Sequence, residues 1–348
     1  MEARHEALLA LLRTEHRLKV SAAAEAIGIS PATVRRDIAE LAAKGLVKRE
    51  HGFVLDTAGS VTGPGLSIGM LVPDLGYYFP KVIDGARAAI SALDGNLTVT
   101  VTGYQGPGRD RAQIERLLSR DVDGLIMTPS FEELGRDDYA QWLHSLKVPV
   151  VLAERLLPPG SRLVDFDRVN SAHIDGLFLA LRHLQSTGKN RIALAGRSDS
   201  PTAAALGVAW QRASELDPQL LEPIQLPHGS DDTPEQFEEL VETILQKLSE
   251  GSLDGLIVHN DRDALILTQR ILEAGFAVPG QLGIVAYDGE VAALADIPLT
   301  EVSPPKEHVG RMAAELLIDR IASGLTTPPR HVQLLPTLTV RQSTVSIS

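Results

Sequence analysis

The chain has 348 residues, a formal net charge of −12 and no cysteine. The lack of cysteine excludes disulfides, thiol catalysis and zinc or iron–sulfur sites with Cys ligands. With 44% hydrophobic and 22% charged residues, the composition is that of a globular protein and argues against extended disorder. The length predicts two or three domains.

The N-terminal stretch MEARHEALLALLRTEH contains only a short apolar core flanked by charges. It does not have the pattern of a secretory signal, and no apolar run approaches the roughly 18 residues that a membrane span needs. We therefore expect a cytoplasmic protein without a membrane partner.

Charge is distributed unevenly along the chain. Residues 1–56 hold nine Lys/Arg against eight Asp/Glu, whereas the remainder holds 24 against 37. The acidic excess therefore belongs to the C-terminal part, and the N-terminal part can present its own local field. The boundary coincides with DTAGSVTGPGL at 56–66, whose Gly, Ser, Thr and Pro content is typical of a linker. This predicts a small unit at 1–55 and a large unit at 67–348.

The small unit is predicted to form three short helices and a hairpin. Helical spacing of leucines covers 4–14, a second helix is expected at 21–27, and a third at 31–45. Ser30 is the predicted N-cap of the third helix, followed by proline at its first position. Residues 46–55 predict two strands around a turn.

The large unit repeats a short β-branched run, a polar loop and an amphipathic helix. Such alternation predicts parallel α/β sheets with both faces covered. VDGLIM (122–127) and LDGLIV (253–258) open alike, which is compatible with two similar lobes. The predicted strands are 67–73, 98–102, 123–127, 148–153, 191–195, 223–226, 254–258 and 282–287.

Polar and aromatic residues follow these strands, where ligands bind in open α/β sheets. They are Asp74, Tyr77, Tyr78, Phe79, Thr128, Glu154, Arg155, Arg197, Ser198, Asp199, Asn260, Asp261, Asp288 and Glu290, the last two on either side of Gly289. Aromatic faces, carboxylates and an amide in one cleft suit a polyhydroxylated ligand such as a sugar. Each polar residue could instead cap the next helix or complete a turn, and the Tyr-Tyr-Phe run could pack between lobes.

The sequence matches none of the common catalytic or phosphate-binding motifs that we considered. STGKN at 186–190 has Asn190 where a phosphate-binding loop has Ser or Thr, and the segment precedes a strand. No G-x-S-x-G, H-E-x-x-H or paired-histidine metal spacing occurs. We expect no catalytic residue, no metal, no cofactor and no enzymatic activity.

Residues 4–53 resemble the winged helix-turn-helix of DeoR-type bacterial regulators. The likeness is carried by SPATVRRDIAELAAKGLVKREHG, which matches that family's Ser-x-x-Thr-hydrophobic-Arg-Arg-Asp pattern and its Arg-x-His-Gly wing. Phe53 replaces the second wing glycine. The resemblance implies that the third helix enters the major groove of double-stranded operator DNA. The DNA-binding residues it implies are Ser30, Thr33, Arg35, Arg36, Lys48, Arg49 and His51.

Residues 67–345 resemble the effector domain of the LacI/GalR family, which has the fold of periplasmic sugar-binding proteins. SIGMLVPDLGYYFPKVIDGA, RDVDGLIMTP and LIVHNDRDALILTQRILEAGFAVPGQLGIVAYDGE carry the likeness. It implies two α/β lobes, about 67–163 plus 297–327 and about 164–296 plus 328–348, with the effector between them. The effector-binding residues it implies are Asp74, Tyr77, Tyr78, Phe79, Glu154, Arg155, Phe166, Asn260 and Asp288.

The sequence departs from this second family at three points, one of which is Glu154, where aspartate is commoner. SPTAAALGVAW has alanines and Leu206 where an arginine that grips sugar hydroxyls is expected, and Arg197, Arg168 or Lys306 could compensate. The Gly-rich 56–66 is unfavourable for the hinge helix of LacI-type regulators. Because carboxylates dominate the predicted cleft, we expect a neutral or cationic carbohydrate-like effector.

Together, the two resemblances imply a ligand-responsive transcriptional regulator, a repressor of a carbohydrate-utilisation operon that acts as a homodimer. A stand-alone sugar-binding protein for transport or chemoreception is the alternative, and an enzyme of sugar metabolism is a weaker third reading. Paired arginines in an acidic chain then serve DNA contact, because charges more than a Debye length of about 8 Å away are screened.

Overall fold

The structure is a computed structural model that describes residues 4–5, 7–9, 11, 17–43, 47–50, 53–56, 65–103, 108–130, 133–197, 200–226, 234–323 and 327–345. The chain separates into two compact units. One contains residues 1–68 and 90–96, and the other contains residues 69–89 and 97–348.

The N-terminal unit has the predicted helices and hairpin. Its helices are a first one that includes residues 4, 5, 7–9 and 11, α2 (Val20–Ile27) and α3 (Pro31–Ala43). Its strands are β1 (Arg17–Lys19), β2 (Val47–Glu50) and β3 (Phe53–Asp56), paired antiparallel in the order β1-β3-β2. The helices bury Leu8, Val34, Ile38 and Leu41 in one core, because these side chains recur at helical spacing. Strand β1 was not predicted.

The first lobe of the large unit is built on a six-stranded sheet in the order β14-β8-β7-β6-β4-β5. The strands are β4 (Ser67–Val72), β5 (Asn96–Val101), β6 (Gly124–Met127), β7 (Val150–Ala153), β8 (Asp167–Ser171) and β14 (His331–Leu334). The helices are α4 (Phe79–Ser91), α5 (Arg109–Leu118), α6 (Asp137–His144), the short η2 (Arg162–Asp165) and α11 (Lys306–Ser323).

The second lobe has its own six-stranded sheet in the order β10-β9-β11-β12-β13-β15. The strands are β9 (Ile192–Gly196), β10 (Ile224–Gln225), β11 (Gly255–His259), β12 (Gly283–Tyr287), β13 (Thr300–Ser303) and β15 (Thr337–Thr339). The helices are α7 (His173–Ser186), α8 (Pro201–Leu216), α9 (Pro234–Ser249), α10 (Asp261–Glu273) and the short η3 (Ala292–Leu294). All pairs are parallel except β13 with β15.

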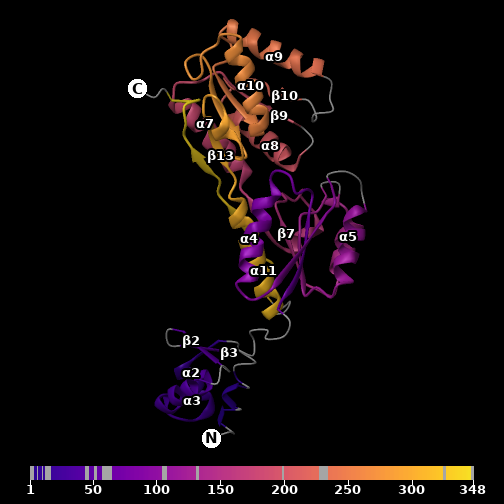
Figure 1. The fold of residues 1–348 in the computed structure, drawn as a ribbon, viewed down its shortest axis with the longest axis vertical. Coiled ribbons are helices and arrows are strands. Elements are labelled where there is room, and N and C mark those ends of the chain that lie inside the picture. Colours follow the sequence, from indigo (N-terminus) through magenta and orange to yellow (C-terminus); the bar gives the residue numbers. More distant parts are fainter. Residues whose placement is uncertain are drawn as a thin grey trace. The chain divides into compact units, whose positions relative to one another are not determined.

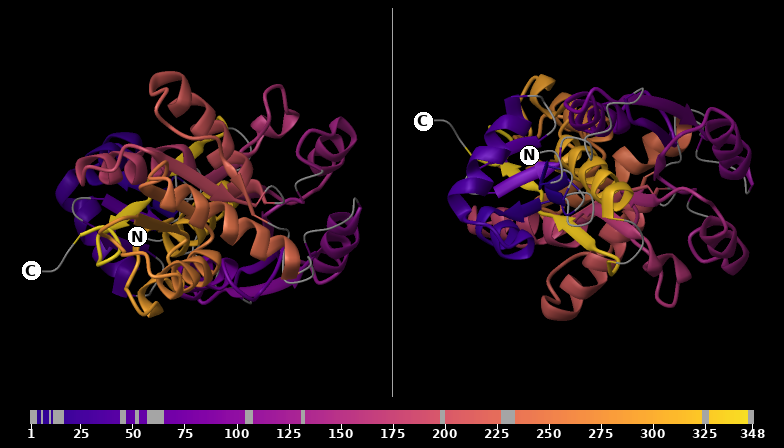
Figure 2. Two further views of the ribbon diagram at one scale, coloured as in Figure 1. Left: turned by 90° about the horizontal axis from the view of Figure 1, so that it is seen from above. Right: turned by 90° about the horizontal axis from the view of Figure 1, so that it is seen from below.

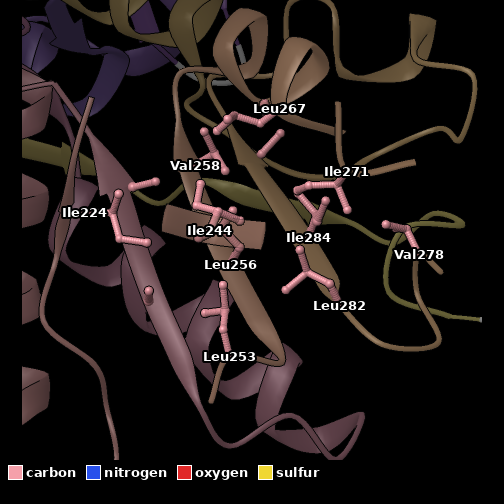
Figure 3. Packing of buried hydrophobic residues seen from close by; sticks show 14 of the residues in the cluster. Ile224, Ile244, Leu253, Leu256, Val258, Leu267, Ile271, Val278, Leu282 and Ile284 are labelled. Atoms are coloured by element: carbon pink, nitrogen blue, oxygen red, sulfur yellow. The ribbon is translucent and has the colours of Figure 1, made fainter. Parts of the chain in front are cut away.

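Helices cover both faces of the second sheet (Figures 1 and 2). On one face, α9 and α10 pack against β11 and β12 through residues such as Ile244, Leu256 and Ile284 (Figure 3). On the other face, Leu181 of α7 and Trp210 of α8 pack against Val285. Strands buried on both faces read as continuous apolar runs, which is why LIV and GIVAY segments form them. The predicted two-lobed parallel α/β architecture is confirmed.

The chain crosses between the lobes three times, after β8, after β13 and after β14. All three crossings lie further along the chain than expected. Strand β8 follows the expected boundary at 163, yet its parallel pairing with β7 holds it in the first sheet. Strand β13 follows the expected boundary at 297, yet it pairs with β12 in the second sheet. Strand β14 follows the expected boundary at 327, yet it pairs with β8 in the first sheet.

Helices α4 and α11 lie beside each other in the first lobe (Figure 1). A Cβ atom added to Gly85 would lie 1.9 Å from the Glu307 carbonyl oxygen, and one added to Gly310 would lie 1.8 Å from that of Val82. Only glycine permits two helix backbones to approach so closely. In the described part of the chain, no helix is long and apolar enough to cross a membrane.

Candidate ligand cleft and nucleic-acid interface

Strand ends from both lobes meet at a cavity of about 520 Å³. Its volume falls in the range of small-molecule sites. The structure brings together eight of the nine predicted effector residues as its lining: Asp74, Tyr77, Tyr78, Phe79, Glu154, Arg155, Asn260 and Asp288. They come together because the carboxyl ends of parallel strands share one edge of each sheet.

Phe166 is the predicted residue that does not line this cavity. Its ring stacks on His144 of α6, with 4.5 Å between ring centroids, and it packs against the first-lobe core. The expectation placed Phe166 at a crossover, but the chain crosses only after β8, so an apolar ring directly before that strand packs into its own lobe.

Both carboxylate oxygens of Glu154 are engaged within the protein. Oε1 accepts hydrogen bonds from the Tyr78 hydroxyl and the Ser171 hydroxyl, each at 2.8 Å, and Oε2 accepts one from the Ser171 backbone N–H at 3.1 Å. His173 Nε2 lies 4.0 Å from Oε2. Burial lowers the pKa of His173, so its ring favours the neutral form. Glu154, which lines the cavity, is therefore hydrogen-bonded to the end of β8, where the first crossing begins.

Two residues of the lining have left-handed backbone conformations. Glu154 follows β7 with φ +52°, and Asp288 follows β12 with φ +96°. Non-glycine residues rarely adopt these angles, and such strain is concentrated at functional sites. The two residues occupy equivalent positions after a strand in the two lobes.

Asp288 is a buried carboxyl without a strong counter-ion. Its Oδ2 lies 3.6 Å from His259 Nε2, and its Oδ1 has no hydrogen-bond partner among the described residues. Burial raises the pKa of Asp288 to about 7. Lys306 donates to the Asp288 backbone carbonyl and, at 2.5 Å, to Glu290, so its ammonium does not pair with the Asp288 side chain.

Asn260 is the N-cap of α10. Its Oδ1 accepts hydrogen bonds from the backbone N–H of Arg262 at 3.0 Å and of Asp263 at 3.3 Å. Helix capping, the alternative role considered for this residue in the sequence analysis, is therefore confirmed. Capping uses the oxygen alone, which leaves the amide N–H groups of a cavity-lining residue as donors.

Several lining residues were not predicted as binding residues. Among them are His173, His259 and Arg262. Arg197, one of the cations considered in the sequence analysis, also lines the cavity. His259 directly follows the predicted strand 254–258 and ends β11, a position that sequence reasoning could have included. Of the three cations considered as compensating groups, Arg197 makes two bonds to Asp263 at 2.9 and 3.0 Å. Lys306 and Arg168 are not among the cavity-lining residues.

Two of the aromatic rings at the cavity already make cation–π contacts with side chains of the protein itself. The Arg262 guanidinium lies over the Tyr77 ring at 4.4 Å, and the Lys306 ammonium lies over the Tyr78 ring at 4.9 Å. Phe79 is buried, with its ring centroid 5.4 Å from that of Tyr78. Stacking of these rings on a ligand remains a prediction.

In the N-terminal unit, α3 exposes its first turns. The Ser30 hydroxyl accepts the Thr33 N–H at 3.1 Å, as an N-cap does, and Arg35 and Arg36 are exposed. Arg36 has a weak ion pair with Glu40, at 3.6 Å. Such a helix start presents cations and backbone N–H groups, which suit phosphate and base contacts.

Asp37, the third residue of the Arg-Arg-Asp motif, serves the fold. It is buried and accepts two hydrogen bonds from the Arg4 guanidinium, each 3.1 Å, which ties the first helix to α3. Lys48 and Arg49 lie in β2. The predicted contact His51 and most of the predicted linker lie outside the described residues.

Comparison with known proteins identifies two domains. Residues 4–55 match the DeoR-like helix-turn-helix domain, and residues 181–344 match the periplasmic binding protein-like domain. An arabinose metabolism transcriptional repressor of Geobacillus stearothermophilus is 25% identical over 96% of this chain and 91% of its own.

Solved structures share the fold. A transcriptional regulator CelR–cellobiose complex is 25% identical, with a TM-score of 0.63 over 90% of this chain and 91% of its own. A lac repressor dimer bound to operator and an anti-inducer is 22% identical, with a TM-score of 0.65 over 83% of this chain and 98% of its own. The chain is thus a DeoR-like helix-turn-helix domain joined to a periplasmic binding protein-like domain, and transcriptional repressors are among its relatives.

Proposed function

We propose that this protein is a ligand-responsive transcriptional regulator, a repressor of carbohydrate-utilisation genes whose sugar-like effector binds between the two lobes. The observation that carries this is the cavity in which hydrogen-bonding side chains of both lobes converge, in a chain with a DeoR-like DNA-binding domain. A relative is a repressor of arabinose metabolism, and a similar structure holds cellobiose.

The effector we propose is neutral or cationic. Asp74, Glu154 and Asp288 line the cavity, while the Arg197 guanidinium is neutralised by Asp263. A phosphate dianion near these acidic side chains would be repelled, more strongly as Asp288 ionises with its pKa of about 7, whereas hydroxyl or ammonium groups would donate to them. Arg155 donates to the carbonyls of Pro129 and Glu154 at 2.5 and 2.8 Å, which commits part of its guanidinium.

The remaining parts of the proposal concern the whole chain. Residues 1–55 contact operator DNA, 56–66 link, and 67–348 bind effector and form the homodimer. A cytoplasmic location follows from the DNA partner. A stand-alone sugar-binding protein for transport would have no use for the N-terminal domain, so we favour the regulator over it.

A thermal-shift screen, followed by calorimetry, tests the proposal. Arabinose, ribose, cellobiose, glucosamine and their phosphate esters are the probes, with and without DNA from the neighbouring promoter. We expect a neutral or amino sugar to bind and to change the affinity for DNA. Tight binding of a sugar phosphate, without response to its neutral parent, would overturn the ligand assignment.

Truncation of two polar lining residues gives a sharper test. Asp288→Ala and Asn260→Ala each leave ligand donors or acceptors unpaired, so affinity falls by about 1–3 kcal/mol, or 5- to 150-fold. Asp138→Ala, at an exposed first-lobe position, is the control and leaves affinity unchanged. Equal affinity in all three variants would place the ligand elsewhere.

A further inference from the structure

Asp261, the first residue of α10, is fully buried but is not among the cavity-lining residues. Its Oδ2 accepts hydrogen bonds from the backbone N–H groups of Glu290, Val291 and Ala292 at 2.5, 2.6 and 3.2 Å. These residues lie in the segment after β12, which begins with Asp288 and leads into η3. One carboxylate oxygen thus fixes the loop that presents Asp288 to the cavity.

The other oxygen of Asp261 reaches the first lobe. Oδ1 accepts a hydrogen bond from the Tyr77 hydroxyl, and Tyr77 belongs to the loop between β4 and α4. The Arg262 guanidinium covers the same ring at 4.4 Å. A hydroxyl bonded to a buried carboxylate is among the stronger hydrogen bonds in proteins. Asp261 therefore joins the Asp288 loop and the first lobe through one side chain.

Glu290 adds a second contact between the loop after β12 and the first lobe. Its Oε2 lies 3.0 Å from Nζ of Lys81 on α4, and its Oε1 accepts from Lys306 at the start of α11. Lys81 is half exposed, so this ion pair contributes less than the Tyr77 bond. We call Tyr77, Lys81, Asp261 and Glu290 the interlobe clasp.

We propose that Asp261 is a positioning residue that couples effector binding to lobe closure through the interlobe clasp. A ligand that binds Asp288 contacts the loop that Asp261 fixes. The Asp261 carboxylate also accepts the hydrogen bond from Tyr77 of the opposite lobe. The identity of the ligand rests on the proposed function, whereas the clasp itself can be tested without a ligand.

Tyr77→Phe is the informative variant because it removes one hydroxyl only. The ring, its contact with Arg262 and the three backbone bonds to Asp261 remain, so the second lobe retains its fold. Tyr139→Phe is the matched control, since the Tyr139 hydroxyl donates to buried Asp110 at 2.9 Å within the first lobe. Both variants lose a tyrosine–aspartate bond, but only one bond joins the lobes.

Distance measurement between spin labels tests closure in the absence of ligand. The chain has no cysteine, so Glu115→Cys on α5 and Glu242→Cys on α9 provide two unique sites on exposed positions. We expect one narrow distance distribution in the parent and in Tyr139→Phe, and a broadened or longer one in Tyr77→Phe. Identical distributions in all three proteins would overturn the clasp.

Effector kinetics provide the second measurement. For a sugar found by the screen, we expect Tyr77→Phe to release it about tenfold faster than the parent, with Tyr139→Phe unchanged. Unchanged release in Tyr77→Phe would refute the coupling even if the distances change. A chain that shows the distance effect but binds no sugar would support the clasp and refute the proposed function, so the two failures are distinguishable.

Discussion

At the scale of single residues, Asp288 shows how burial sets the charge of the cleft. Its pKa is raised to about 7, and burial is the main cause, opposed by Lys306 and His173 and reinforced by Asp261 and Glu290. An unfolded aspartate titrates near 4. Between these two pH values the folded protein keeps a proton that the unfolded chain has lost. This group's stabilising contribution is therefore complete below about pH 4 and is lost as the pH rises to 7.

The Asp288→Asn variant isolates this effect, because asparagine has the same shape and does not titrate. We expect the parent to lose a few kcal/mol of unfolding free energy between pH 5 and pH 8 relative to the variant, a cost of about 1.4 kcal/mol per pKa unit. Urea denaturation at each pH measures it. Parallel pH profiles for the two proteins would mean that Asp288 ionises at an ordinary pH.

Arg35 is the residue on which we expect operator affinity to depend most. It is exposed near the start of α3, while Arg36 is weakly paired with Glu40. Arg35→Ala should lower specific affinity by about 1–3 kcal/mol, the worth of a bidentate base contact, without a change in melting temperature. Electrophoretic mobility shifts with the promoter fragment measure this, with exposed Arg87→Ala as control. Operator binding equal to that of the parent would remove Arg35 from the interface.

Residue types were easier to predict than residue roles. Asp288, Asn260 and Tyr77 could be placed at the cleft from their positions after predicted strands. That both carboxylate oxygens of Glu154 would be engaged by Tyr78 and Ser171 could not be predicted, because Ser171 lies beside Glu154 only through the pairing of β8 with β7. The roles of Asp261 and His173 depend in the same way on contacts between distant segments.

At the scale of elements, the close approach of α4 and α11 depends on two glycines. Gly85→Ala would place its Cβ against the Glu307 carbonyl, so the helices must separate. We expect a loss of several kcal/mol of unfolding free energy from this overpacking. Thermal unfolding measures it.

Gly207→Ala is the control for this prediction. Gly207 lies within α8 and an added Cβ meets nothing within 4 Å, so helix propensity alone should stabilise by up to about 1 kcal/mol. Equal effects of the two substitutions would show that the α4–α11 contact does not limit stability.

The elements themselves differed in how far they could be predicted. Apolar β-branched runs such as GLIV and GIVAY predicted β11 and β12, because strands buried on both faces need such residues. Strand β8 reads DRVNS and has no such signal. Its first residue, Asp167, is paired with Arg320 of α11 at 2.7 Å, and a partner 153 residues away is invisible to local pattern.

At the scale of the whole molecule, we predict a homodimer formed by residues beyond 67. One DNA-binding domain of this size covers only a short half-site, and a symmetric pair of such domains doubles the contacts with operator DNA. Sedimentation of the full chain and of residues 67–348 at micromolar concentration should give dimers for both. A dimeric full chain with a monomeric 67–348 fragment would move the interface into the N-terminal part.

The three crossings between the lobes constrain how the protein is made. The first sheet starts with β4 but is completed by β14, and the second ends with β15, so neither sheet is whole until these two late strands have been synthesised. The N-terminal unit, by contrast, precedes both lobes along the chain apart from one short segment. The N-terminal DNA-binding unit can therefore fold while the two-lobed effector-binding unit is still incomplete. Because each sheet contains strands from both sides of a crossing, we expect the two lobes to acquire their final structure together.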